Sequence, residues 1–173
     1  MNVQQTLAAF GATAAIGPLR CGESLNDVVA ALGAPWDIGR VSERRRWPHL
    51  FSYGDVEICV CRCRRITMMC LQAWRDTIAL PAPGSATIAS HPGGLTLAHV
   101  TDALDAIDCR YRPVTLHQPP GQMALEAATT GVAFTFRTDV EAQPLLDTAG
   151  SWTTTHTCAP LPSDLPDDGL GAP

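Results

Sequence analysis

The chain has 173 residues, of which 46% are hydrophobic and 17% charged, so it can bury the core of one globular domain or of two small fused ones. Its formal net charge of -5 argues against a nucleic-acid-binding protein, whose binding domain is usually strongly basic. No apolar run reaches the roughly 18 residues of a membrane helix, and no Lys or Arg precedes Arg20, so we expect neither a membrane span nor a secretory signal. The seven cysteines, an odd number, favour reduced thiols over a disulfide framework, and the protein is predicted to be cytoplasmic.

A helix is predicted near the start of a first unit, residues 18–80. Ser24 is a good N-cap, and apolar residues follow it at helical spacing as far as Leu32. Gly33 is expected to end this helix. Residues 1–17 are treated as a separate N-terminal segment that contains a short helix.

The rest of the first unit is predicted to be a loop followed by a three-stranded meander. The stretch 37–48 is polar and rich in arginine, which is typical of a loop. Strands are expected near 50–53, 56–61 and 66–74. In the second of them, Glu57, Cys59 and Cys61 alternate with Val56, Ile58 and Val60 and so lie on the opposite face. Cysteine and methionine on the neighbouring strand make both faces of the sheet apolar, and such a second apolar face is typical of an interface. Coverage by the N-terminal segment or by the rest of the chain is the alternative.

The helix pattern recurs about 72 residues later, which predicts an internal repeat. Gly22, Ser24 and Leu25 reappear as Gly94, Thr96 and Leu97. We therefore expect a linker at 81–92, a second helix-plus-meander unit at 93–152, and a disordered, acidic, proline-rich tail at 153–173. The predicted fold is α+β, with two tandem α-β-β-β units that form a largely antiparallel sheet with helices on one face.

This pattern resembles two known families. A glycine, a Ser/Thr cap, a short helix and the sequence from Leu32 to Pro35 before a meander are similar to the repeat of SmpA/OmlA-type outer-membrane assembly lipoproteins. Two such units in tandem resemble the beta-lactamase inhibitory proteins, which implies one continuous sheet. The segment Tyr53–Ile58 also resembles uncharacterised actinobacterial proteins, for which an immunity role beside a toxin is implied.

The cysteines at 59, 61, 63 and 70 invite a metal interpretation, but their spacing favours reduced thiols that are buried or face a partner. Alternate residues of a strand are about 6.6 Å apart. Zinc, bound at about 2.3 Å from each sulfur, needs them closer. The zinc-knuckle spacing, with two residues between cysteines, is also missing. Neither a metal nor another cofactor is predicted.

The densest cluster of charged and aromatic residues runs from Arg44 to Trp47. Arginine, tryptophan and tyrosine dominate the energetics of protein interfaces. A solvated loop with Trp47 tucked into the core is the alternative. The predicted partner-binding residues are Trp36, Arg44, Arg45, Arg46, Trp47, Tyr53, Glu57, Cys59 and Cys61.

The sequence contains no P-loop, dinucleotide fingerprint or nucleophile elbow, and its five histidines share no motif spacing, so no catalytic residue is predicted. We expect a non-enzymatic intracellular protein-binding module, most concretely an immunity protein or inhibitor that occludes a toxin or enzyme with an acidic surface. A regulatory domain for a small ligand is the alternative. Self-association into a homodimer is a third possibility, and neither nucleic acid nor a membrane is expected as partner.

Overall fold

The computed structural model describes residues 2–82, 86–114, 120–139, 143–153 and 156–158. Its helices are α1 (Val3–Thr13), α2 (Leu25–Leu32) and α3 (Leu97–Asp105). Its strands are β1 (Ala15–Ile16), β2 (Leu19–Arg20), β3 (Trp36–Ser42), β4 (Arg45–Tyr53), β5 (Val56–Val60), β6 (Ile66–Gln72), β7 (Thr77–Pro81), β8 (Ile88–Pro92), β9 (Tyr111–Val114), β10 (Gln122–Ala127), β11 (Ala133–Arg137) and β12 (Leu145–Trp152). The protein is of the predicted α+β class.

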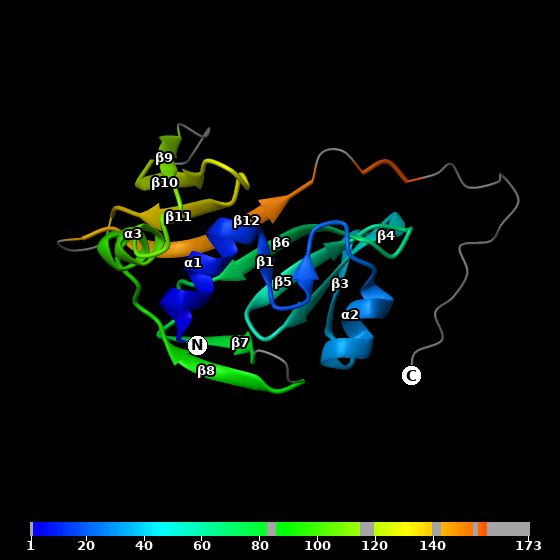
Figure 1. Ribbon diagram of the computed structural model, residues 1–173. Helices are drawn as coiled ribbons and strands as arrows, with labels where there is room; N and C mark the ends of the chain where they lie inside the picture. Colours follow the sequence, from blue (N-terminus) through cyan, green and yellow to red (C-terminus); the bar gives the residue numbers. More distant parts are fainter. Residues whose placement is uncertain (1, 83–85, 115–119, 140–142, 154–155, 159–173) are drawn as a thin grey trace, which may run out of the picture.

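Eight of the strands form one antiparallel sheet in the order β3-β4-β5-β6-β12-β11-β10-β9. Strand β12, the last strand in the described part of the chain, therefore lies in the middle of the sheet between β6 and β11. The remaining strands pair as β1-β2 and β7-β8. Figure 1 shows the three helices on one side of the large sheet and the β7-β8 hairpin below it. No helix in the described part of the chain has the length and apolar character needed to cross a membrane.

One hydrophobic core joins the helices to the inward face of the sheet. It includes Leu7 and Phe10 of α1, Val28 of α2, Leu104 of α3 and Phe134 of β11. Strand β5 alternates buried and half-buried residues, as its sequence predicts. The second apolar residue set of the sheet therefore faces away from the helices.

Local sequence signals determine where α2 and α3 begin. The Ser24 side chain accepts a hydrogen bond from the backbone N–H of Asn26, and Gly33 ends α2 with a φ of 81°. Thr96 caps α3, and the His99 side chain completes a capping box by accepting from the Thr96 N–H. Both predicted caps are confirmed.

The prediction of a loop at 37–48 is wrong, because this stretch forms β3 and most of β4. All residues of β3 are exposed except Gly39, so this edge strand lacks the alternation that marks a half-buried strand. Two register shifts further disturb its pairing with β4. Each of α2 and α3 is thus followed by strands that end in the large sheet, and the meander after α2 has four strands instead of three.

The segment 81–92, predicted to be a linker, contains strand β8. It pairs with β7, whose Ile78 and Leu80 are buried. Asp55 ties this hairpin to the large sheet, because its backbone N–H donates to the Ala79 carbonyl and its carboxylate accepts from the Ala79 N–H at 2.7 Å. The hairpin is therefore part of the packed structure.

Tyr53 gives the folded state a dependence on alkaline pH. Its hydroxyl donates to the Gly33 carbonyl at 2.9 Å, and burial raises the pKa of this phenol to about 12. Below the unfolded pKa of about 10, both states are protonated and the stability is complete. Above it, the unfolded state ionises first, so about 2 kcal/mol of stability is lost as the pH rises from about 10 to 12.

We expect urea denaturation of the wild-type chain to show this loss between about pH 9 and pH 11.5. Tyr53→Phe should reduce the fall, because no ionisable group then remains at this buried position. Tyr111→Phe changes the only other tyrosine, a half-buried one whose pKa is also raised, first by burial and then by Asp105, so the two variants compare the contributions of the two phenols. An equal fall in wild type and Tyr53→Phe would show that the buried phenol is not its source.

Candidate functional site: a thiol-imidazole cluster beside an arginine-rich surface

The turn between β5 and β6 brings Cys61 and Cys63 together. Strand β5 ends at Val60, so both cysteines lie outside it. The Cys61 N–H donates to the Arg65 carbonyl at 3.0 Å, and the Arg64 N–H donates to the Cys61 carbonyl at 2.9 Å. Arg64 adopts a left-handed conformation with a φ of 61°, which reverses the chain tightly. The separation of about 6.6 Å between alternate strand residues therefore does not apply to this pair.

The pairing of β12 with β6 directs the C-terminal segment to the same turn. Trp152 pairs with Met68, and the next N–H, of Thr153, donates to the Thr67 carbonyl at 3.0 Å. Because the strands are antiparallel, the end of β12 lies beside the start of β6. His156 arrives there beside the two cysteines.

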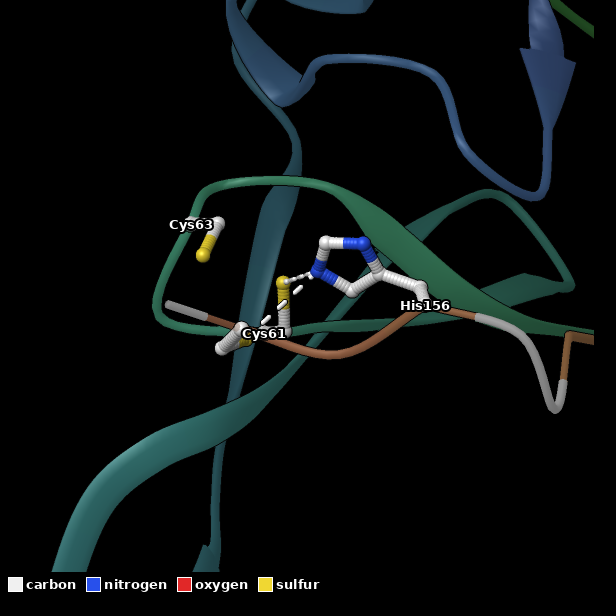
Figure 2. A group of neighbouring side chains, drawn as sticks. Cys61, Cys63 and His156 are labelled. Carbon is white, nitrogen blue, oxygen red and sulfur yellow. Dashed lines mark hydrogen bonds between the residues drawn. The ribbon is translucent and has the colours of Figure 1, made fainter. Parts of the chain in front are cut away.

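Four side chains of the turn and the C-terminal segment form a compact cluster: Cys61, Cys63, His156 and Cys158. Their sulfur atoms and an imidazole nitrogen all lie within 4.8 Å of one another. The His156 Nε2 is 3.3 Å from the Cys61 sulfur and 3.5 Å from the Cys158 sulfur. Figure 2 shows the imidazole pointing at the Cys61 sulfur, with the Cys63 side chain to the left of Cys61.

The thiols of this cluster differ in how readily they ionise. Burial raises the pKa of Cys61, which is 8% exposed. Burial also opposes ionisation of Cys158, but hydrogen bonds with the side chain and backbone of Cys63, with Cys61 and with His156 outweigh it and lower the pKa of Cys158 to about 6. Of these two thiols, Cys158 therefore loses its proton more readily and forms the thiolate.

A hollow lies between this cluster and strand β4. Its volume is about 640 Å³, and it is lined by Arg44, Arg45, Arg46, Trp47, Pro48, Cys61, Arg62, Thr67 and Cys158. The Arg62 guanidinium donates to the Cys158 carbonyl at 3.3 Å, so it links the C-terminal segment to the hollow. The Arg64 guanidinium lies 5.5 Å from the centre of the Trp47 ring, within cation-π range.

Four arginines line this hollow, and Arg64 lies against the ring of Trp47. Seven of the chain's 12 basic residues lie between 40 and 65: Arg40, Arg44, Arg45, Arg46, Arg62, Arg64 and Arg65. The same interval has only three acids, Glu43, Asp55 and Glu57, so its formal charge is about +4, whereas the whole chain carries -5. We call the residues that line the hollow, together with Arg64, the arginine surface. Its field favours an anionic ligand or partner.

The structure brings together five of the nine residues predicted to bind a partner, namely Arg44, Arg45, Arg46, Trp47 and Cys61. Trp36 does not line the hollow; it is 76% exposed at the other end of β3 and pairs with Ser52. Tyr53 is 4% exposed and belongs to the core, because its side chain points inward from β4 and bonds Gly33. It presents almost no surface to a partner.

Glu57 and Cys59 are half-buried on the outward face of β5, as their alternation predicts. Glu57 pairs with Cys70 and Cys59 pairs with Met68 on β6. Burial, followed by the nearby charges of Glu57 and Asp147, raises the pKa of Cys70 to about 11, so this thiol stays protonated at neutral pH. The outward face of β5 and β6 thus combines half-buried thiol and thioether groups with the Glu57 carboxylate.

Sequence reasoning missed His156 and Cys158 because it placed both in a tail predicted to be disordered. Thr153 and residues 156–158 of that tail are described and lie near the start of β6, while the rest lies outside the described residues. One available signal was that two ligand pairs share one spacing, Cys61 with Cys63 and His156 with Cys158. No sequence pattern predicted the pairing of β12 with β6, which brings the two ligand pairs together.

No protein-family model matches this chain, and comparisons with curated proteins and with solved structures find no significant match. The resemblance to beta-lactamase inhibitory proteins and to SmpA/OmlA-type repeats stays an expectation. The function is therefore inferred from the residues described above.

Proposed function

We propose that this chain is a non-enzymatic protein-binding module that engages an acidic partner through the arginine surface. The observation that carries this proposal is the hollow of about 640 Å³ with four arginines and Trp47 in its lining. A concave site lets a partner's carboxylates meet several guanidinium groups at once, and arginine binds carboxylates in a bidentate manner. The flanking tryptophan adds apolar area of the type that anchors protein interfaces.

An immunity protein or inhibitor is the specific form of this function that we propose. Such a protein acts by covering its partner, so it needs a rigid surface and no catalytic group. Strand β4 and the β5-β6 turn supply the arginine surface from a continuous sheet, which favours rigidity. The seven free thiols fit work in a reducing compartment such as the cytoplasm.

The chain is also proposed to consist of two related units, one with α2 and one with α3. Equivalent hydrogen bonds support this. The first N–H of α2, on Leu25, donates to the Arg64 carbonyl, and the first N–H of α3, on Leu97, donates to the Pro144 carbonyl. The accepting residues lie just before β6 and β12, the two strands that meet at the centre of the sheet. An experimental structure in which residues 18–80 and 93–152 do not superpose would contradict this relationship.

Charge reversal tests the arginine surface. We expect Arg44→Glu/Arg45→Glu to weaken binding to a polyglutamate peptide, a defined acidic probe, by about tenfold or more at low salt, because attraction becomes repulsion. Fluorescence anisotropy measures the affinity. Arg20→Glu/Arg110→Glu changes the net charge equally at exposed sites outside this surface and is the matched control.

Equal loss of affinity in both double variants would mean that only net charge matters and would contradict a localised site. Once a native partner is identified by capture from the host, the same pair of variants applies to it. Saturable stabilisation of the chain by a small anion such as citrate, abolished by Arg44→Glu/Arg45→Glu, would instead favour the small-ligand alternative.

A further inference from the structure

We propose that Cys61, Cys63, His156 and Cys158 bind one zinc ion, which fastens the C-terminal segment to the β5-β6 turn. The cluster has three thiols and one imidazole within 4.8 Å of one another. This site goes beyond the proposed protein-binding function, because its chemistry stands whether or not the arginine surface binds a partner.

The distances fit tetrahedral zinc coordination. With zinc-sulfur bonds of about 2.3 Å and zinc-nitrogen bonds of about 2.0–2.1 Å, ligand atoms at the corners of a tetrahedron lie about 3.5–3.8 Å apart. The His156 Nε2 is 3.3 and 3.5 Å from the sulfurs of Cys61 and Cys158. All four ligand atoms lie within 4.8 Å of one another, so no pair exceeds the tetrahedral separation by more than about 1 Å.

The ligand set selects the metal. Three thiolates and one imidazole are soft to borderline donors, which zinc prefers and magnesium or calcium do not. Four protein ligands fill the tetrahedron, and such a closed site is structural rather than catalytic. On binding, the thiols that become ligands lose their protons to the solvent, and the sulfur atoms donate electron pairs to the metal without any change of oxidation state.

The backbone of the turn favours thiolate ligands. The backbone of Cys63 forms hydrogen bonds to the sulfurs of Cys61 and Cys158, and such bonds stabilise the negative charge of thiolates. The Arg62 guanidinium holds the Cys158 carbonyl and brings positive charge near the site. One residue, instead of the usual two to four, separates the ligands of each pair, and the second pair arrives from a strand that is distant in sequence.

The ligands differ in exposure, which makes the proposal testable without unfolding the protein. Cys61 is buried, His156 and Cys158 are half-buried, and Cys63 is exposed. Cys63→Ser and His156→Ala therefore change residues at the surface end of the cluster and are suitable variants. Cys59→Ser and His91→Ala, both outside the cluster, are the matched controls.

The experiment uses the full chain, stripped of metal with a chelator under reducing conditions and titrated with cobalt(II) and then zinc. We expect one cobalt ion per chain, with the visible bands of tetrahedral cobalt and a near-ultraviolet charge-transfer band from thiolate, and stoichiometric displacement by zinc. Cys63→Ser and His156→Ala should each lower the zinc affinity by about a hundredfold or more, while the controls retain it. Cys63→Ser should also weaken the charge-transfer band, whereas His156→Ala should preserve it.

Hydrogen exchange gives a second readout that does not depend on spectroscopy. Zinc should slow exchange at residues 156–158 in wild type and in Cys59→Ser, but not in Cys63→Ser. Octahedral cobalt spectra, affinity unchanged in both ligand variants, or loss of affinity equally in the controls would each overturn the site. None of these results depends on binding of polyglutamate, so failure here is distinct from failure of the arginine surface.

Discussion

Replacing Phe134 by alanine is expected to destabilise the folded chain by about 3–5 kcal/mol. The Phe134 side chain is 0% exposed on β11, and it lies beneath the place where α1 and α3 approach each other. A Cβ on Gly11 of α1 would be 3.2 Å from its ring and 2.7 Å from the Leu104 side chain of α3, so the lack of a side chain at Gly11 allows this close packing. Truncation of Phe134 to alanine would leave a cavity between α1, α3 and β11. The backbone hydrogen bonds of these elements hinder them from closing it.

Chemical denaturation followed by circular dichroism measures this effect. Phe134→Leu keeps most of the volume and is expected to cost about 1.5 kcal/mol or less. A loss from Phe134→Ala as small as that of Phe134→Leu would mean that α1 collapses into the space, and would contradict the rigid packing described for the core.

Gly54→Ala is expected to cost about 2–4 kcal/mol, the second-largest effect. Gly54 begins the turn between β4 and β5 with a φ of 63°, where an L-residue is strained. An added Cβ would also lie 2.4 Å from the Ala79 carbonyl oxygen, which accepts the Asp55 N–H. The substitution would therefore strain the turn and push the β7-β8 hairpin away from the sheet.

Gly94→Ala separates the two causes. Gly94 has a φ of 65°, but an added Cβ there would meet nothing within 4 Å. We expect this control to cost only the conformational strain of about 1–2 kcal/mol. If thermal denaturation shows equal losses for the two variants, the close approach of Ala79 contributes nothing.

The elements that local signals specify were predictable from the sequence. Caps at Ser24 and Thr96, the stop at Gly33 and the alternation of β5 each depend on neighbouring residues, and each is confirmed. Strand β3 was not predictable, because an edge strand exposed on both sides carries no hydrophobic alternation.

Of the two candidate sites, one was predictable from neighbouring residues in the sequence and the other was not. The run from Arg44 to Trp47 drew attention by composition alone, and its residues do line one hollow. The thiol-imidazole cluster depends on a pairing between β6 and β12, whose partners such as Cys70 and Gly150 are far apart in the chain. Spacing rules that assume one strand or one loop cannot detect ligands united by such a pairing.

The central place of β12 has a consequence for biosynthesis. A ribosome delivers β3 to β6 and β9 to β11 before β12 exists, so β6 and β11 both present unpaired edges until the final strand is made. A nascent chain stalled before Leu145 would hold two half-sheets with nothing between them, and such edges template aggregation. Completion of the fold therefore waits for β12, and a chain truncated before Leu145 would leave both edges open.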